Sequence, residues 1–382
     1  MPEPFTIDPD IARAWTLPAR AYTDPAVFEA AKERVFARSW QFVGDEGEVR
    51  VPGQLKPFTL LEGCLNEPLL LTRDMKDQLH CLSNVCTHRG TILCEKGRSE
   101  SGAGFERTLT CRYHGRRFDL DGTMKHMPEF QGVQGFPSEK DNLAKVAWGK
   151  WGTDRGGWLF ASLSPRSSFE EVLGPVMERM SFLPLDRFVF DASRSRDYLV
   201  RANWALYCDN YLEGFHIPFV HAGLNEVLDY GEYAAEMFPW CNLQLGIGKS
   251  GEHCFELPRS SPDFGRGGRG GGGGGGGVAA YYWWVFPNLM LNFYPWGLSV
   301  NVVKPLGVDS TRVSFLSYVL DASKLDAGAG AGLDRVERED ESVVEAVQQG
   351  MRSRLYDRGR YSPTREQGVH HFHRLLASAL FE

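Results

Sequence analysis

The sequence lacks the segments that mark membrane-spanning and secreted proteins. No apolar run reaches the roughly 20 residues of a membrane-spanning helix. The N-terminus, Met1-Pro2-Glu3-Pro4, has neither the basic nor the apolar region of a signal peptide. Eight cysteines in 382 residues suit thiols or metal ligands better than a disulfide framework. We therefore expect a cytoplasmic location and no membrane partner.

Positive charge and dinucleotide-binding motifs are also missing. The formal net charge of −7 at pH 7 argues against a nucleic-acid partner. No GxGxxG fingerprint occurs at a strand–helix junction, so the chain is not expected to bind a flavin or nicotinamide dinucleotide itself. The rest of the composition, 42% hydrophobic and 24% charged, is that of an ordinary globular protein. At 382 residues, two domains are expected.

The pattern of apolar residues divides the chain into three regions. Residues 1–39 are predicted to be a helical segment, with Asp24 capping a helix that starts at Pro25, and to pack on the last region. Residues 40–163 alternate short apolar runs with turns, which predicts a small all-β domain. Residues 164–382 are predicted to be α+β, an antiparallel sheet with helices on one side.

The last region contains the clearest helix and strand patterns. Residues 278–303 are rich in β-branched and aromatic side chains and are predicted to be strands. A helix is predicted from Asn203 to His221, ended or distorted at Pro218. A second amphipathic helix is predicted over residues 337–355. Its expected apolar face consists of Val343, Val344, Val347 and Met351.

Residues 265–277 are eleven glycines and two arginines, a composition that cannot bury apolar surface. We predict a flexible loop here. An RGG-type nucleic-acid tract is the functional alternative, which the net negative charge of the chain disfavours.

Two short segments each offer one thiolate and one imidazole. They are Cys86-Thr87-His88-Arg89-Gly90 and Cys111-Arg112-Tyr113-His114-Gly115. Two cysteines and two histidines bind either one zinc ion or a [2Fe–2S] cluster with the cysteines on one iron. Each segment supplies its own Cys and His, whereas the common zinc finger places both cysteines first.

A second set of candidate ligands lies in the stretch from Asp209 to His221. His216 and His221 are five residues apart, so a helix would need a break to bring them together, and Pro218 is a candidate for that break. Two imidazoles and one carboxylate form the facial triad of non-haem iron(II) oxygenases. The alternative is an ordinary pair of core or surface histidines.

The two Cys–His segments resemble the cluster-binding loops CxHxG and CxxHG of Rieske proteins. The resemblance implies a [2Fe–2S] cluster on Cys86, His88, Cys111 and His114. Residues 98–107 then look like an inserted turn between the two loops.

The Asp209–His221 stretch resembles the iron motif of Rieske oxygenase α subunits, and particularly the choline monooxygenase-like branch. The resemblance implies a mononuclear Fe(II) on His216, His221 and a downstream carboxylate. Matching Gln348 to the glutamine after the family's acidic turn places that carboxylate on Asp340. The flanking Glu339 and Glu341, like Glu345, are expected to be solvated acids near a helix N-terminus.

The same resemblance implies the fold and the assembly. Residues 40–163 would be the Rieske domain, and residues 164–382 a catalytic domain with the helix-grip (START-like) fold. Glu213 would bridge His114 of one subunit and His216 of the next in a head-to-tail ring, expected to be a homotrimer. Electrons would come from NAD(P)H through a separate reductase or ferredoxin.

The implied activity is that of a terminal oxygenase, which uses O2 to hydroxylate or oxidatively demethylate a small organic substrate. A quaternary ammonium compound is favoured, and an aromatic-ring dihydroxylating dioxygenase is the alternative. A different class, a Rieske-type electron carrier or zinc-binding module, would require the histidine–carboxylate set to be accidental. The predicted pocket residues are Asn210, Phe215, Asn292 and Tyr294. Candidates for cation–π contacts are Tyr281, Trp283, Tyr294 and Trp296, each more simply explained as core.

Overall fold

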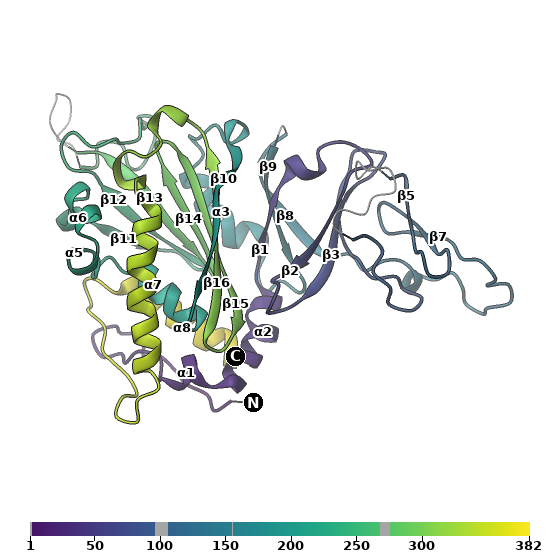
Figure 1. The fold of residues 1–382 in the computed structure, drawn as a ribbon, viewed down its shortest axis with the longest axis horizontal. Coiled ribbons are helices and arrows are strands. Elements are labelled where there is room, and N and C mark those ends of the chain that lie inside the picture. Colours follow the sequence, from purple (N-terminus) through teal and green to yellow (C-terminus); the bar gives the residue numbers. More distant parts are fainter. Residues whose placement is uncertain (1, 96–105, 155, 268–275) are drawn as a thin grey trace. The chain divides into compact units, whose positions relative to one another are not determined.

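Two units make up the chain in the computed structural model (Figure 1). Residues 37–166 form one unit, and residues 1–36 with 167–382 form the other. The structure describes residues 2–95, 106–154, 156–267 and 276–382. The expected inserted turn at 98–107 and the glycine run at 265–277 fall largely outside these ranges.

The smaller unit is built from three-stranded antiparallel sheets, which agrees with the predicted all-β domain. One sheet has the order β1 (Gln41–Asp45), β9 (Gly156–Ser162), β8 (Ala147–Thr153). A second consists of β2 (Leu55–Leu60), β3 (Glu67–Arg73) and β4 (Leu79–Ser83). The third consists of β5 (Thr108–Thr110), β6 (Arg117–Asp119) and β7 (Met124–His126).

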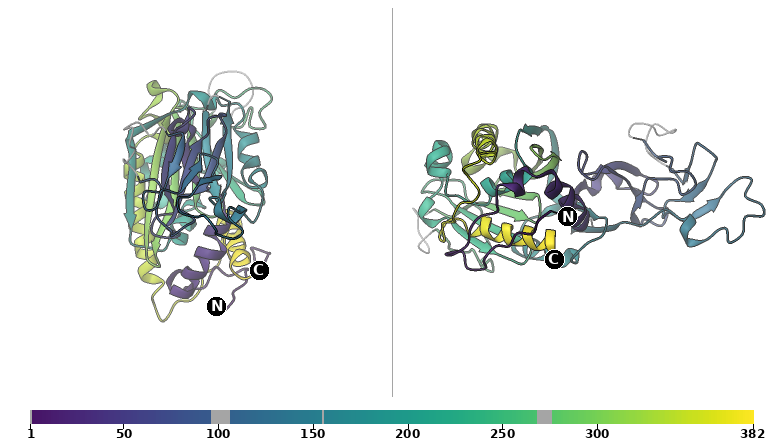
Figure 2. Two further views of the ribbon diagram at one scale, coloured as in Figure 1. Left: turned by 90° about the vertical axis from the view of Figure 1, so that its right-hand side faces the viewer. Right: turned by 90° about the horizontal axis from the view of Figure 1, so that it is seen from below.

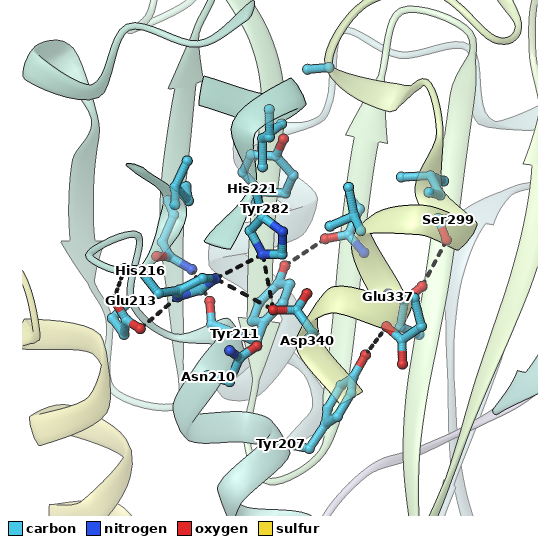
Figure 3. Close-up of a pocket in the computed structure, with 18 of the residues that line it drawn as sticks. Tyr207, Asn210, Tyr211, Glu213, His216, His221, Tyr282, Ser299, Glu337 and Asp340 are labelled. Atoms are coloured by element: carbon cyan, nitrogen blue, oxygen red, sulfur yellow. Dashed lines mark hydrogen bonds and ion pairs between the residues drawn. The ribbon is translucent and has the colours of Figure 1, made fainter. Parts of the chain in front are cut away.

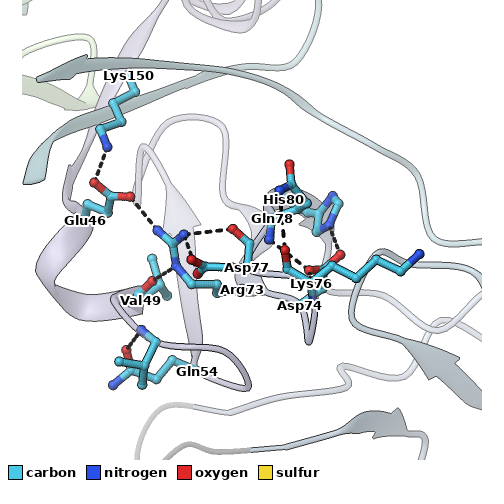
Figure 4. Close-up of polar contacts among 11 residues, drawn as sticks. Glu46, Val49, Gln54, Arg73, Asp74, Lys76, Asp77, Gln78, His80 and Lys150 are labelled. Carbon is cyan, nitrogen blue, oxygen red and sulfur yellow. Dashed lines mark hydrogen bonds and ion pairs between the residues drawn. The ribbon is translucent and has the colours of Figure 1, made fainter. Parts of the chain in front are cut away.

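A buried arginine joins two of these sheets (Figure 4). Arg73, at the end of β3, donates from Nε to the Val49 carbonyl at 2.6 Å and from Nη2 to Glu46 Oε1 at 2.5 Å. Glu46, which follows β1, also forms an ion pair with Lys150 of β8. Asp77 Oδ1 also pairs with Arg73 Nη1 at 3.1 Å, so two carboxylates compensate the charge of this buried side chain.

The larger unit is built on one seven-stranded antiparallel sheet (Figure 1). Its strands, in spatial order, are β10 (Val189–Val200), β16 (Ser310–Val319), β15 (Gly297–Gly307), β14 (Leu289–Tyr294), β13 (Val278–Val285), β12 (Cys241–Ile247) and β11 (Ala234–Met237). The predicted strand region 278–303 corresponds to β13, β14 and most of β15, which pair as successive hairpins.

Helices cover both faces of this sheet, so the expectation of helices on one side was wrong. Side chains alternate along β13, and Tyr281 and Tyr282 therefore point to opposite faces. α3 (Phe169–Arg179) lies on the Tyr281 face, where Arg179 Nε and Tyr281 Oη bond to Asp263 Oδ2 at 2.7 and 3.1 Å. α4 (Trp204–Tyr211), α7 (Leu333–Gly350) and α8 (Gln367–Phe381) cover the other face.

The N-terminal segment packs on the larger unit beside α8 (Figure 2). α1 (Arg20–Thr23) is followed by α2 (Pro25–Arg34), whose predicted cap is confirmed, since Asp24 Oδ1 accepts from Ala26 N at 2.8 Å. Arg34 of α2 donates to the Leu380 carbonyl of α8 at 2.6 Å. Among the described helices, none is long and apolar enough to cross a membrane.

The helix predicted from Asn203 to His221 is broken earlier than expected. The predicted range contains α4 and α5 (Ile217–Val220), and α6 (Ala222–Val227) follows it. The break precedes Pro218, which instead occupies the first turn of α5, where a missing N–H costs nothing. Gly214 lies in the break, and a Cβ there would come within 2.7 Å of the Tyr233 ring. The turn is therefore set by close packing at Gly214.

α7 also differs from its prediction. It starts at Leu333 and ends at Gly350, and its buried residues are Glu337, Val344 and Gln348, while Val347 is exposed. Glu337 and Gln348 occupy the buried face because they bond to Tyr207 of α4 and to its cap residue Asn203. A prediction based on the spacing of apolar residues cannot find buried polar residues.

Candidate metal centres and active site

α4 and α7 are fixed against each other by side-chain bonds to the backbone. Asn203 caps α4 by accepting from Ala205 N at 2.9 Å, and its own N–H donates to Gln348 Oε1 of α7 at 2.7 Å. Gln348 is buried. This contact sets the alignment of the two helices that line the site.

Three side chains converge in front of the sheet (Figure 3). Asp340 Oδ1 of α7 lies 3.0 Å from His221 Nε2 and 3.5 Å from His216 Nε2, and the two Nε2 atoms are 3.1 Å apart. One ligand atom from each residue lies within 4.8 Å of the others. Two imidazoles and one carboxylate on one side of a point match the donor set that iron(II) oxygenases use.

Each imidazole is oriented by a second carboxylate. Glu213 Oε1 lies 2.6 Å from His216 Nδ1, and Glu339 Oε2 lies 2.8 Å from His221 Nδ1. Bonds at Nδ1 leave both Nε2 atoms facing the common point. Burial alone would lower the pKa of His221, but its hydrogen bonds to the carboxylates of Asp340 and Glu339 outweigh burial, and the pKa is raised.

The structure corrects the expected roles of the neighbouring acids. Glu339 was expected to be a solvated acid, but it contacts His221, and that hydrogen bond lowers its pKa. Glu345 is paired with Arg201 at 2.7 Å. Glu341 is paired with Arg338 at 3.0 Å. These acids lie beyond the first turn of α7, because the helix starts at Leu333.

A cavity with about 780 Å³ of empty space, including the part open to solvent, adjoins the three converging side chains. Residues from α4, the sheet and α7 line it. Besides Glu213, His216, His221 and Asp340, the polar and aromatic ones are Tyr207, Asn210, Tyr211, Tyr233, Gln244, Tyr282, Asn292, Tyr294, Ser299, Asn301, Phe315 and Glu337.

Three of the four predicted pocket residues line this cavity, namely Asn210, Asn292 and Tyr294. Phe215 does not, and its prediction is corrected: its side chain is 43% exposed and packs on Phe219, with ring centroids 6.3 Å apart. It lies in the break before α5, whose geometry the sequence did not indicate.

Two of the four cation–π candidates are core residues, as their simpler explanation predicts. Tyr281 and Trp283 are buried on the α3 face, whereas Tyr282, between them, faces the cavity. Tyr211 and Tyr233 line the cavity as well and were missed. The alternation of side chains along β13 predicts that Tyr282 lies on the face opposite to Tyr281 and Trp283. It does not predict which of the two faces lines the cavity.

Glu337 is a further cavity residue that the sequence did not single out. It is 3% exposed, and its Oε2 accepts from Tyr207 Oη at 2.6 Å. Its Oε1 is buried and has no hydrogen-bond partner among the described residues. Burial raises its pKa to about 8. It lies one helical turn before Asp340, on the same side of α7.

In the smaller unit, the two Cys–His loops share one backbone pattern. Gly90 N donates to the Cys86 carbonyl at 3.0 Å, and Gly115 N donates to the Cys111 carbonyl at 2.9 Å. Both glycines have φ of +72°, a conformation that other residues rarely adopt. Each loop thus turns tightly behind its cysteine.

The four side chains form a layered set. Cys86 and Cys111 are 1% and 2% exposed, while His114 is exposed and its ring centroid lies 4.7 Å from that of His88. Burial, followed by contact with Cys111, raises the pKa of the Cys86 thiol. His88 Nδ1 is buried without a hydrogen-bond partner in the described part of the chain. Inner sulfurs and an unpaired imidazole nitrogen fit a Rieske-type cluster.

Zinc fits these four residues less well. Over the described ranges, His216, His221 and Asp340 are the one group of three or more candidate ligands whose atoms all lie within 4.8 Å. A single zinc ion would gather four ligand atoms at least as closely.

Comparison with known families supports both centres. Residues 39–137 match the model of the Rieske [2Fe-2S] domain. Residues 185–382 match that of the ring hydroxylating alpha subunit (catalytic domain).

The chain belongs to the Rieske oxygenase α subunits.

Two curated relatives in this family match nearly the whole chain. The chloroplastic choline monooxygenase of Arabidopsis thaliana is 32% identical over 97% of this chain and 84% of its own length. The carnitine monooxygenase oxygenase subunit of Escherichia coli (strain K12) is 30% identical over 99% of this chain and 96% of its own length.

Solved Rieske oxygenases have the same fold. A quaternary ammonium Rieske monooxygenase, CntA, superposes with a TM-score of 0.76 at 23% identity, covering 99% of both chains. Naphthalene 1,2-dioxygenase from Rhodococcus sp. gives a TM-score of 0.67 at 20% identity, covering 95% of this chain and 93% of that one. The predicted fold, a small Rieske domain and an α+β catalytic domain with an antiparallel sheet, is confirmed.

Membership of this family settles the class and the cofactors. The protein is an oxidoreductase of the Rieske oxygenase type, with a [2Fe–2S] cluster, a mononuclear iron and O2 as co-substrate. The catalytic-domain match over residues 185–382 argues against a bare electron carrier or zinc-binding module.

Proposed function

We propose that this chain is the terminal oxygenase for a small quaternary ammonium compound and hydroxylates a carbon bound to its nitrogen. The observation that carries the proposal is the cluster of His216, His221 and Asp340 beside a cavity that tyrosines line. Tyrosine faces attract quaternary ammonium groups. The names of the choline and carnitine monooxygenase relatives support the same substrate class.

The residue assignments follow from the geometry and the family resemblance. Cys86, His88, Cys111 and His114 would hold the [2Fe–2S] cluster. His216, His221 and Asp340 would hold iron(II), which supplies the redox chemistry for reducing O2. Glu213 and Glu339 keep the two imidazoles oriented.

The proposed hydroxylation needs two electrons from an external donor. A C–H bond of the substrate breaks and a C–O bond forms with one atom of O2. The other atom leaves as water, which takes up two protons and two electrons. A reductase or ferredoxin that draws on NAD(P)H supplies those electrons. When the hydroxylated carbon is an N-methyl group, the C–N bond then breaks to give formaldehyde, the demethylated amine and a proton.

Electron delivery would take place between subunits of a homotrimeric head-to-tail ring. Glu213 would accept a hydrogen bond from His114 of the neighbouring subunit while it holds His216 Nδ1. Its 2.6 Å contact with that nitrogen supports this role, as does the exposure of His114. The link would make proton movement depend on the redox state of the cluster.

Product analysis tests the proposal. Protein purified without oxygen is combined with a surrogate reductase, NADH and a panel of quaternary amines and arenes. We expect hydroxylated or demethylated amines coupled to O2 uptake, and no turnover by His216→Ala despite a normal cluster EPR signal. Arene cis-diols in place of amine products would overturn the substrate class. Unchanged turnover by His216→Ala would overturn the iron site.

A further inference from the structure

The catalytic cavity contains a buried carboxylate that the iron assignment does not use. Glu337 is 3% exposed, yet it lines the cavity (Figure 3). Tyr207 Oη donates to its Oε2 at 2.6 Å, whereas Oε1 has no partner among the residues described. A buried polar atom without a partner is costly, at about 1–3 kcal/mol. This oxygen is therefore available to a cation or a hydrogen-bond donor in the cavity.

Apart from the two histidines, the ionisable side chains with acidic or basic charge in the cavity lining are all acids. The described lining includes three carboxylates, Glu213, Glu337 and Asp340, and contains no lysine or arginine. Glu213 bonds to His216 and Asp340 contacts both histidines, so these two acids belong to the metal site. Glu337 is the carboxylate left to face a substrate.

The rest of the cavity lining offers neutral polar groups to a substrate. Asn210, Gln244, Asn292 and Asn301 line the cavity, as does Ser299. Tyr211, which also lines it, donates to Asn292 Oδ1 at 2.7 Å. These amides and hydroxyls can hydrogen-bond to an alcohol group of a substrate. They cannot neutralise the charge of a substrate carboxylate that is buried in the cavity.

We propose that Glu337 is the counter-ion of the substrate's ammonium group, and that the cavity selects quaternary ammonium compounds of net positive charge with a neutral polar end. Zwitterions that carry a carboxylate are rejected. This inference rests on the proposed function and narrows its substrate class, since the names of the relatives include both a choline and a carnitine monooxygenase.

The acidic side chains of the cavity affect cationic and zwitterionic substrates differently. Burial raises the pKa of Glu337 to about 8, and an ammonium group beside it favours the ionised carboxylate and gains an ion pair. The ammonium group can also contact the tyrosine rings of the lining. A substrate carboxylate would enter the same acidic cavity without any basic side chain in the described lining to pair with it. Burying an unpaired charge costs several kcal/mol, which outweighs the gain at the ammonium end.

The position of Glu337 also suits the reaction. Residues three apart on a helix have Cβ atoms about 5–6 Å apart, so Glu337 and Asp340 lie on successive turns of one helix face. An ammonium group held at Glu337 therefore has its N-bound carbons toward the side chains of His216, His221 and Asp340. This is the carbon position that the proposed reaction oxidises.

Binding measurements with three matched probes test the inference on the iron-loaded protein without a reductant. The probes are choline, its uncharged isostere 3,3-dimethylbutan-1-ol, and the zwitterion glycine betaine. We expect calorimetry to show choline binding at least about tenfold more tightly than either of the others. In Glu337→Gln, which still offers Tyr207 an acceptor, choline should weaken about tenfold or more while the isostere is unaffected.

The control is Glu345→Gln, an acid on the same helix that pairs with Arg201 and does not line the cavity. It should behave as the unmodified protein, and thermal melting with the cluster absorbance establishes that each variant is folded. Glycine betaine binding as tightly as choline, or a choline-to-isostere ratio unchanged in Glu337→Gln, overturns the inference. Selective choline binding without turnover of any amine would instead overturn the proposed function and leave the charge selectivity intact.

Discussion

Glu339 and His221 lie 2.8 Å apart, from Oε2 to Nδ1, and this contact fixes which nitrogen of the imidazole faces Asp340. Because His221 is buried, the neighbouring carboxylates, rather than solvent, set the orientation of its ring. The ligand-bearing helix α7 thus supplies both the proposed iron ligand and the residue that orients a second ligand.

The first prediction concerns this contact. Glu339→Ala should lower iron affinity by about 10- to 100-fold, because His221 loses the partner that sets its tautomer and ring orientation. Iron retained after dialysis against a competing chelator measures the effect. The cluster absorbance should stay unchanged, and Glu345→Ala on the same helix should retain iron normally. Full iron retention in Glu339→Ala would show that the contact is incidental.

The second prediction concerns the third ligand. Asp340→Ala should lose the mononuclear iron and all turnover, while the [2Fe–2S] EPR signal persists. Glu341→Ala, one residue further along, should keep the iron, because its carboxylate pairs with Arg338 at 3.0 Å instead of with the histidines. Metal analysis of both variants checks the assignment. The reverse result would move the ligand by one residue.

The third prediction concerns electron transfer at Glu213. Glu213→Gln should keep both metal centres but slow reoxidation of a pre-reduced cluster by about 10- to 100-fold when substrate and O2 are added. Single-turnover absorbance measures that rate. Glu226→Gln, at an exposed position on α6, is the matched control. Normal reoxidation in Glu213→Gln would remove this residue from the proposed route.

The fourth prediction compares two aromatic residues near the site. Tyr282→Leu should weaken choline binding by about 2- to 30-fold, the range expected for losing one cation–π contact of 0.5–2 kcal/mol. Phe215→Leu should have no effect on binding, since Phe215 points away from the cavity. Equal losses in both variants would indicate a change in packing unrelated to the cation.

The metal-binding motifs could be predicted from sequence because each is local. Cys86 and His88 belong to one turn, and a single short stretch contains both His216 and His221. Asp340 lies far along the chain, and only the resemblance to a known family placed it. The assignment of each of these residues as a ligand stays a prediction.

The rest of the site depends on how helices pack, which local patterns do not encode. Glu337 and Glu339 looked like ordinary acids of an amphipathic helix, because nothing in their neighbours reveals that α7 turns them toward Tyr207 and His221. Phe215 was misplaced because the chain turns at Gly214, where Tyr233 leaves no room for a side chain.

The last prediction concerns a histidine of α8 that is remote from both metal centres. Burial, aided by the charges of Arg374 and His370, lowers the pKa of His371 to about 4 from its usual value of 6.5. The unfolded chain therefore binds a proton at His371 more readily than the folded one does. Stability should fall as the pH drops from 6.5 towards 4 and should be unaffected by this residue above 6.5.

Between pH 7.5 and pH 5, the loss due to His371 should be about 2 kcal/mol, at 1.36 kcal/mol per pKa unit. Urea unfolding followed by tryptophan fluorescence measures it, since Trp284 has its ring centroid 6.5 Å from that of His371. His371→Gln cannot take up the proton and should lose correspondingly less stability over this range. His126→Gln, at an exposed position on β7, should retain the full loss. If both variants lose as much as the unmodified protein, acid unfolding starts at other groups.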